Sequence, residues 1–125
     1  MARILVVEDE RAVREFVRRA LVHHGHDITL AEDGLDALNV LSKNEFDLLL
    51  TDIVMPGMDG IALALKVARD KPDLKILLMS GFSAERQRAH NLGVLIHRVI
   101  VKPFTLRDIC ESVDDTLAGK VWPTD

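Results

Sequence analysis

The sequence contains a short aliphatic run that ends in a single acid, and this run limits the possible folds more than any other feature. Leucines at positions 48–50 are followed by Thr51 and Asp52, and then by a turn-rich segment. Aliphatic runs of this length between turn residues are typical of strands buried on both faces of a sheet. Open parallel sheets bind ligands where such strands end, so Asp52 lies at a predicted binding edge.

Four other stretches also have the character of strands, although 27–31 alternates as a strand exposed on one face does, and a segment of helical character follows each strand. We predict strands at Arg3–Val7, Asp27–Ala31, 46–51, 75–79 and 95–101. The segment 83–92 carries few apolar residues, so we expect it to be the least anchored helix. Five strand–helix repeats, with crossovers of the length that parallel strands need, predict an α/β fold with a doubly wound sheet of five parallel strands.

Several residues mark where the predicted helices begin and end. Gly25 suits a left-handed cap after the first helix, and Asp59 suits an N-cap before the third. Thr105 and Asp108 have the spacing of a capping box at the start of the last helix. Leu35 is predicted to begin the apolar stripe of the second helix.

Length and composition favour one small domain in a reducing compartment. We assign residues 1–119 of the 125 to this domain and 120–125 to a short tail. The net charge of −4 does not indicate a positively charged surface of the kind that binds nucleic acid or an anionic membrane. The single cysteine cannot form an internal disulfide, and no apolar run approaches the roughly 20 residues that cross a bilayer. We therefore expect a cytoplasmic protein that binds neither nucleic acid nor membrane.

Polar residues stand at the ends of four predicted strands. Glu8 and Asp9 follow the first, Asp52 follows the third, Ser80 the fourth and Lys102 the fifth. A parallel sheet would gather all of them at one edge. Three neighbouring carboxylates repel one another, and a hard divalent cation relieves that repulsion. Mg²⁺, which takes one or two carboxylates and keeps several waters, fits best.

This set of residues suits phosphoryl transfer. A metal and Lys102 would neutralise the phosphoryl oxygens while Asp52 accepts the group as an acyl phosphate. Ser80 would donate its hydroxyl to the anion, and Gly81 leaves room above the site for a phosphodonor. The sequence therefore predicts a phosphoacceptor at Asp52.

Four short motifs resemble those of response-regulator receiver domains of the CheY type. They occupy positions 7–9, 52–60, 80–81 and 102–104, in order and at predicted strand ends, and the resemblance covers residues 3 to about 119. Each motif is weak alone, and the four together are specific. The resemblance implies a (βα)5 sheet of strand order 2-1-3-4-5.

The resemblance also implies roles for individual residues. Asp52 would receive phosphate from a histidine kinase or a histidine phosphotransfer protein. Asp9, Asp52 and the main-chain carbonyl of Val54 would bind Mg²⁺, with Glu8 acting through water. The Lys102–Pro103 peptide would be cis, the isomer that proline permits.

Two positions depart from the family pattern. The first acid is more often Asp, so Glu8 implies a rearranged water shell around the metal. The switch position three residues before the lysine is usually Tyr or Phe, and here it is Val99, which has no ring to rotate. We therefore predict that the signal passes through Ser80 and its loop, or through the helix at 83–92.

The same comparison predicts a long-lived phosphorylated state. The positions that orient the hydrolytic water in this family are Val54 and Phe82 here, and neither side chain can hold a water. We expect the chain not to be an enzyme beyond slow loss of its own phosphate.

Output is expected through a downstream partner, because no effector domain follows Gly119. Four segments, at 1–5, 50–56, 80–82 and 102–104, are similar to the CpdR type of stand-alone receiver. This resemblance implies a phosphorylation-controlled adaptor of a protease. One alternative is a phosphatase of the haloacid-dehalogenase type, although residues 8–10 lack its Asp-x-Asp pair. The other is a degenerate receiver that acts without phosphate, although all the chemical residues are present.

Three histidines lie near the predicted end of the first helix. His23, His24 and His26 lack a supporting pattern of cysteines or acids, so we assign them to the surface. Cys110 falls on the apolar stripe of the last helix and is predicted to be a core residue.

Overall fold

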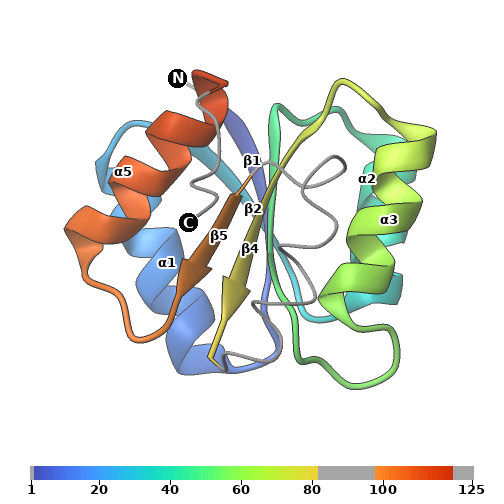
Figure 1. The fold of residues 1–125 in the computed structure, drawn as a ribbon, viewed down its shortest axis with the longest axis horizontal. Coiled ribbons are helices and arrows are strands. Elements are labelled where there is room, and N and C mark those ends of the chain that lie inside the picture. The colour runs from blue at the N-terminus through green and yellow to red at the C-terminus, as the bar shows by residue number, and fades with distance from the viewer. Residues whose placement is uncertain (1, 82–97, 120–125) are drawn as a thin grey trace, which may run out of the picture.

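The computed structural model describes residues 2–81 and 98–119, and one parallel sheet forms its centre. The strand order is β2-β1-β3-β4-β5, as the resemblance implied. Every adjacent pair is parallel, so all the carboxyl ends lie at one edge of the sheet. The strands are β1 (Arg3–Val7), β2 (Asp27–Ala31), β3 (Leu48–Asp52), β4 (Lys75–Ser80) and β5 (Arg98–Val101) (Figure 1).

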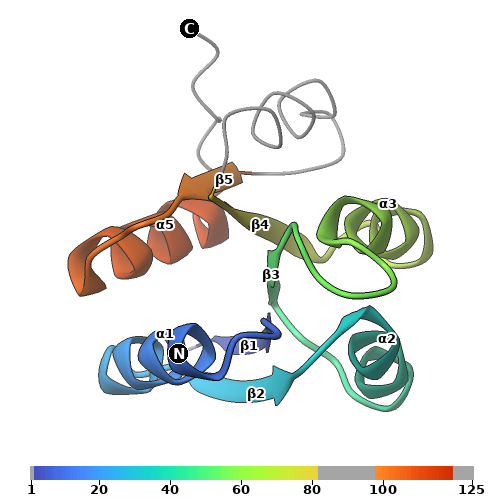
Figure 2. The same cartoon turned by 90° about the horizontal axis from the view of Figure 1, so that it is seen from below.

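Helices cover both faces of this sheet. Seen from below, two helices lie on one side of the strands and two on the other (Figure 2). The first pair is α1 (Arg11–His23) and α5 (Leu106–Leu117), and the second is α2 (Gly34–Lys43) and α3 (Gly60–Asp70). The predicted doubly wound α/β fold is therefore confirmed. Among the described residues, no helix is long and apolar enough to span a membrane.

The central strand β3 is buried along its whole length. Its residues alternate between the two cores: Leu49 packs in the α2/α3 layer, and Leu48 and Leu50 pack in the α1/α5 layer. Each fully buried leucine stabilises the fold by about 1.5–3 kcal/mol relative to an exposed one. This burial on both sides holds Asp52 rigidly at the end of the strand.

The predicted helix boundaries are confirmed at three places. Gly25 follows α1 with a φ of +99°, which a residue with a Cβ rarely adopts. The Asp59 carboxylate accepts a hydrogen bond of 2.8 Å from the Ala62 N–H at the start of α3. Thr105 and Asp108 form the predicted capping box of α5.

Some predicted boundaries differ from the structure. Leu35 is 73% exposed and does not join the buried face of α2, which carries Ala37 and Leu41 instead. The reason is that Asp33 caps the helix, so α2 begins at Gly34, and its buried face follows Gly34, Ala37 and Leu41 at helical spacing. Strand β3 begins at Leu48 rather than at 46. The predicted helix at 83–92 and the tail at 120–125 lie outside the described residues.

Candidate functional site

Three acidic side chains meet at the carboxyl edge of the sheet. Glu8 follows β1, Asp9 comes next, and Asp52 is the last residue of β3. Carboxylate oxygens of the three lie within 4.8 Å of one another. Glu8 and Asp52 are buried and Asp9 is exposed, so the cluster has a buried wall and a mouth open to solvent. The structure thus brings together the acids that the sequence placed at strand ends.

Lys102 enters this cluster from the end of β5. Its Nζ lies 2.9 Å from Oε1 of Glu8 and 3.2 Å from Oδ1 of Asp52. The Lys102 N–H donates a 2.7 Å hydrogen bond to the carbonyl of Ser80, which ties the β5–α5 loop to the end of β4. The Lys102–Pro103 peptide is cis, as the resemblance implied.

Burial and neighbouring charges shift the pKa values of Glu8 and Lys102. Burial raises the pKa of Glu8 to about 7, and the charge of Asp52 adds to the rise while the hydrogen bond from Lys102 opposes it. Burial alone would lower the pKa of Lys102, but Glu8 and Asp52 together hold that pKa above its usual value. The lysine therefore stays charged at neutral pH, and a second cation would favour the ionised form of Glu8.

The main chain around Asp52 is held by short-range contacts. Oδ1 of Asp52 accepts a 3.0 Å hydrogen bond from the Ile53 N–H, and the Thr51 hydroxyl donates to the Asp52 carbonyl at 3.0 Å. The Gly60 N–H donates to the Ile53 carbonyl at 2.7 Å. A Cβ on Gly60 would lie only 1.9 Å from the Asp52 carbonyl oxygen, so the start of α3 packs against β3 only with glycine there.

Sequence reasoning assigned no structural role to two residues that support this site. One is Gly60, which lies in the motif at 52–60 but whose contact with Asp52 the sequence did not indicate. The other is Arg14, whose Nη1 donates a 2.8 Å hydrogen bond to the carbonyl of Glu8. Arg14 is one helical turn into α1, where an arginine is ordinarily solvated. No local pattern separates it from the other arginines of that helix.

The residues predicted to form the switch lie on neighbouring strands. In the register of β4 with β5, Leu78 pairs with Val99 and Ser80 pairs with Val101. Ser80 and Val99 therefore face the same side of the sheet, two residue pairs apart along the ladder. Both are buried, and Val99 packs into the α2/α3 core. Val54 lies in the loop after β3 with an exposed side chain, and the role of its carbonyl stays a prediction.

The donors at this edge are carboxylate oxygens, with one lysine beside them. Such a set suits a hard cation such as Mg²⁺ better than ions that prefer nitrogen or sulfur. The buried Glu8 also supports a cation, since its carboxylate is costly to ionise without one. Glu8, Asp9 and Asp52 are thus the residues that could hold Mg²⁺.

The chain matches a known family over most of its length. Residues 4–114 match the model of the response regulator receiver domain. The fold is also that of solved receivers: chemotaxis response regulator CheY4 of Vibrio cholerae aligns with a TM-score of 0.85 at 25% identity, covering 93% of this chain and 98% of that one. Fold and acidic edge together define a receiver-type α/β module. The chain belongs to the response regulator receiver family.

Three named proteins show how similar the chain is to individual response regulators. The chain is 40% identical over 117 residues to the response regulator receiver protein CpdR of Brucella abortus, covering 94% of this chain and 98% of that protein. It is 36% identical to response regulator MprA of a Mycobacterium species, of which it spans 46%. Response regulator TrrA of Thermotoga maritima, solved in complex with Mg²⁺ and BeF, aligns with a TM-score of 0.84 at 34% identity, covering 93% of this chain and 99% of that one.

Proposed function

We propose that this chain is a phosphorylation switch that accepts a phosphoryl group on Asp52 and signals through a partner protein. The observation that carries the proposal is the position of Lys102, whose Nζ lies 3.2 Å from Oδ1 of Asp52 inside an acidic cluster. Without a charge-neutralising group, an incoming phosphoryl anion would be repelled by Glu8, Asp9 and Asp52. Lys102 supplies one such charge at the acceptor itself.

The proposed reaction transfers phosphate from a phosphohistidine. A carboxylate oxygen of Asp52 forms a bond to phosphorus as the phosphorus–nitrogen bond of the donor breaks, and the histidine nitrogen leaves with the electron pair. Bound at Glu8, Asp9, Asp52 and the Val54 carbonyl, Mg²⁺ would neutralise charge on the phosphoryl oxygens. Lys102 does the same from the β5 side, and the buried wall of the site limits solvent.

Ser80 is the proposed sensor of the phosphorylated state. It ends β4 beside the loop that Lys102 anchors, since the Lys102 N–H donates to its carbonyl. Val99, two residue pairs away along the ladder, has no ring that could follow a movement of Ser80. We therefore assign signal transmission to Ser80 and the segment that follows it. Spectra of the residues around Ser80 and Val99 that are identical with and without a phosphoryl mimic would contradict this assignment.

We infer the partners of this chain from its membership in the receiver family and from its similarity to CpdR. A histidine kinase or a histidine phosphotransfer protein would supply the phosphate, in the cytoplasm. The near full-length likeness to CpdR supports output through a protein partner, and we propose an adaptor role toward a protease. Residues 1–119 would act as the receiver domain and 120–125 as its tail.

A phosphorylation assay tests the proposal. The full chain is incubated with Mg²⁺ and acetyl phosphate or phosphoramidate, and intact-mass spectrometry then measures retained phosphate. We expect one phosphoryl group per chain, none on Asp52→Asn, and unchanged labelling of the control Asp27→Asn, which alters an exposed carboxylate on β2. Omission of Mg²⁺ should abolish labelling.

The same assay separates the rival functions. Sustained hydrolysis of a phosphomonoester would favour the haloacid-dehalogenase type of phosphatase. Neither labelling nor hydrolysis, in a chain that circular dichroism shows to be folded, would favour a degenerate receiver. The membership in the receiver family argues against the phosphatase, and the intact acidic cluster argues against the degenerate receiver.

A further inference from the structure

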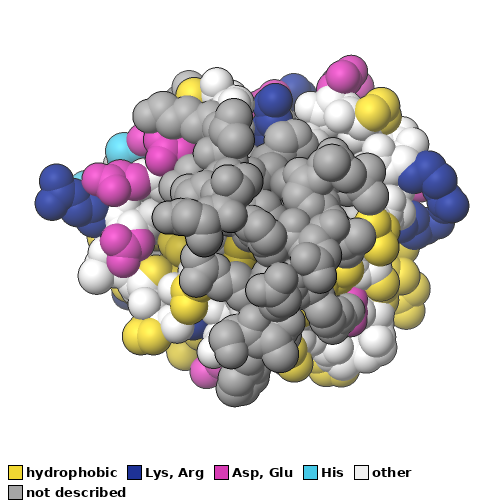
Figure 3. All heavy atoms as spheres, viewed as in Figure 1, with side chains coloured by type: hydrophobic (Ala, Val, Ile, Leu, Met, Phe, Trp, Pro, Cys, Tyr) yellow, Lys and Arg dark blue, Asp and Glu magenta, His cyan; other side chains and the backbone are white. Residues whose placement is uncertain are grey.

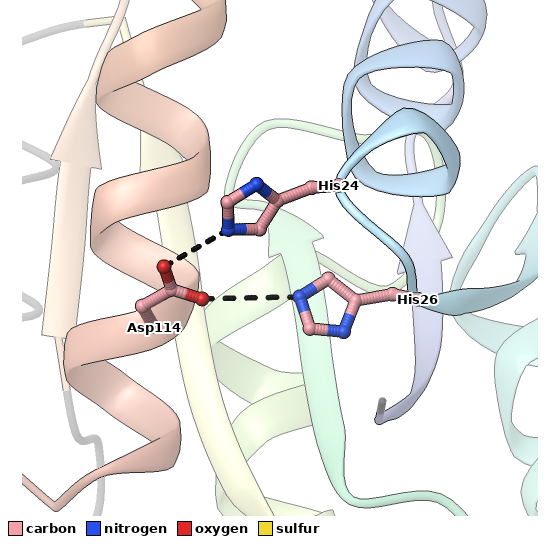
Figure 4. Close-up of side chains that lie close together, drawn as sticks. All are labelled: His24, His26 and Asp114. Atoms are coloured by element: carbon pink, nitrogen blue, oxygen red, sulfur yellow. Dashed lines mark hydrogen bonds and ion pairs between the residues drawn. The ribbon is translucent and has the colours of Figure 1, made fainter.

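A second cluster of potential ligands lies at the opposite edge of the sheet from Asp52. His24 caps the end of α1, His26 immediately precedes β2, and Asp114 lies on α5. Figure 4 shows both imidazoles pointing at the one carboxylate. The sequence assigned these histidines to the surface: His23 and His24 are exposed as expected, but the side chain of His26 is largely buried and Asp114 lies beside it. Asp114 is 90 residues away from His24 in the chain, so no local pattern could reveal it.

The three side chains are spaced closely enough for one ion. Nε2 of His24 lies 3.0 Å from Oδ2 of Asp114, and Nε2 of His26 lies 3.9 Å from Oδ1. In a tetrahedral zinc site with bonds of about 2.0–2.2 Å, neighbouring ligand atoms lie roughly 3.3–3.6 Å apart. One donor atom from each of the three residues lies within 4.8 Å of the others, so side-chain shifts below about 1 Å would close the site.

His26 is the residue that points to a ligand. Its side chain is only 9% exposed, so its polar atoms are largely cut off from water. Among the described residues, Nε2 of His26 is a buried atom without a hydrogen-bond partner. Buried polar atoms are seldom left without partners, because each costs about 1–3 kcal/mol. This atom is aimed at the space beside Asp114.

We propose that His24, His26 and Asp114 form a binding site for a divalent transition ion of the Zn²⁺ type, separate from the acidic site at Asp52. Two imidazole nitrogens and one carboxylate oxygen suit such an ion, and they suit Mg²⁺ poorly. His24 and Asp114 are about half exposed, so an ion has access from solvent and water completes its coordination. Acidic side chains gather on the α5 side of the molecule with a histidine beside them, which attracts cations (Figure 3).

The protonation of His26 fits this role at neutral pH. Burial lowers the pKa of His26, the neighbouring His24 lowers it further, and Asp114 opposes both. The ring therefore stays neutral, and only a neutral imidazole can bind a metal.

Metal binding would change one backbone contact. Nδ1 of His26 now accepts a 3.1 Å hydrogen bond from the Ala2 N–H, so the neutral ring carries its proton on Nε2. An ion at Nε2 moves this proton to Nδ1, where it faces the Ala2 N–H and removes that hydrogen bond. The loss weakens affinity, and it couples the ion to the start of β1.

A zinc titration of the full chain tests the site. Isothermal calorimetry with Zn²⁺ in saturating Mg²⁺, which occupies the acidic site at Asp52, should show one zinc ion bound per chain. His24→Gln and Asp114→Asn change exposed side chains, and each should weaken binding by at least about tenfold. His23→Gln, which alters the neighbouring exposed histidine, should bind as the unaltered chain does.

Spectroscopy provides a second readout. On addition of Zn²⁺, the imidazole nitrogen signals should show Nε2 of His26 bound and Nδ1 protonated, and the Ala2 amide signal should move. Zinc binding that Mg²⁺ displaces, or that His24→Gln and Asp114→Asn leave unchanged, would overturn the proposal. So would absence of zinc binding to the folded chain.

Discussion

Lys102 lies closer to Glu8 than to Asp52, with Nζ at 2.9 Å from Oε1 of Glu8 and at 3.2 Å from Oδ1 of Asp52. The longer side chain of Glu8, at a position where the family more often has Asp, reaches across the site to the lysine. Glu8 is fully buried, so this ion pair is shielded from solvent. Under the proposed function, a phosphoryl group on Asp52 would therefore compete with Glu8 for Lys102.

Replacement of Lys102 by Met should destabilise the metal-free protein. The change leaves the buried Glu8 without its cation, and removing one partner of a buried pair costs about 3–5 kcal/mol. Proton uptake by Glu8 limits this loss, so we expect about 1–3 kcal/mol from urea unfolding in EDTA at neutral pH. Lys66→Met, which breaks an exposed pair with Asp70, should change stability by less than about 0.5 kcal/mol. Equal effects of the two changes would contradict the pairing.

Glu8 should make the stability of the metal-free protein depend on pH. Its pKa is raised from 4.5 to about 7 in the folded protein. A raised carboxyl pKa contributes stability that is full below about pH 4.5 and is lost as pH rises through about 7. The free energy of unfolding of the unaltered chain, minus that of Glu8→Gln, should therefore fall across this range. Denaturation series in EDTA at several pH values measure it, and a constant difference would refute the assignment.

Gly60→Ala should disrupt the acceptor loop. The added methyl group would sit 1.9 Å from the Asp52 carbonyl oxygen, so β3 and α3 must move apart. We expect a loss of about 3 kcal/mol or more in stability, together with reduced labelling of Asp52. The control is Gly81→Ala, where a Cβ meets no atom of residues 2–81 and 98–119 within 4 Å, and its stability should stay within about 1 kcal/mol of the unaltered chain. Normal labelling of Gly60→Ala would show that the close contact is not needed.

Thr105→Ala should weaken the start of α5. It removes the hydroxyl that accepts the Asp108 N–H at 3.1 Å and leaves half of the capping box. Loss of an N-cap costs about 1 kcal/mol, measurable as a shift in the urea midpoint. Ser42→Ala, which removes an exposed hydroxyl near the end of α2, should be close to neutral. A neutral result for Thr105→Ala would mean that tertiary packing alone holds the helix end.

Val54→Asn should shorten the lifetime of the phosphorylated state. Val54 is 53% exposed beside the acceptor, so a polar side chain fits there without repacking and can orient a water toward the phosphate. We expect phosphate loss to quicken by roughly tenfold, which is less than the roughly hundredfold or more that a general acid or base contributes, because Asn only orients the water. Time courses of retained phosphate measure the rate, with Val54→Ala as the matched control. An equal rate in the two variants would contradict the predicted role of this position.

The sequence alone determined the element order and the edge at which the site lies. Aliphatic runs such as 48–50 and helical periodicity are local signals, and the strand ends at Glu8, Asp52, Ser80 and Lys102 follow from them directly. The caps at Asp59 and Thr105 are local as well, because side chain and partner are three residues apart. Such features depend on neighbouring residues and can be predicted without the fold.

Only the tertiary structure decided which distant side chains meet. The pairing of Lys102 with Glu8 spans 94 residues, and the approach of Asp114 to His24 and His26 depends on how α5 packs beside α1. The need for glycine at position 60 comes from a contact with β3 that no turn pattern reveals. These contacts form when the helices pack against the two faces of the sheet. Burial then raises the pKa of Glu8 and lowers that of His26. Periodicity identifies the elements, whereas their packing determines the chemistry between them.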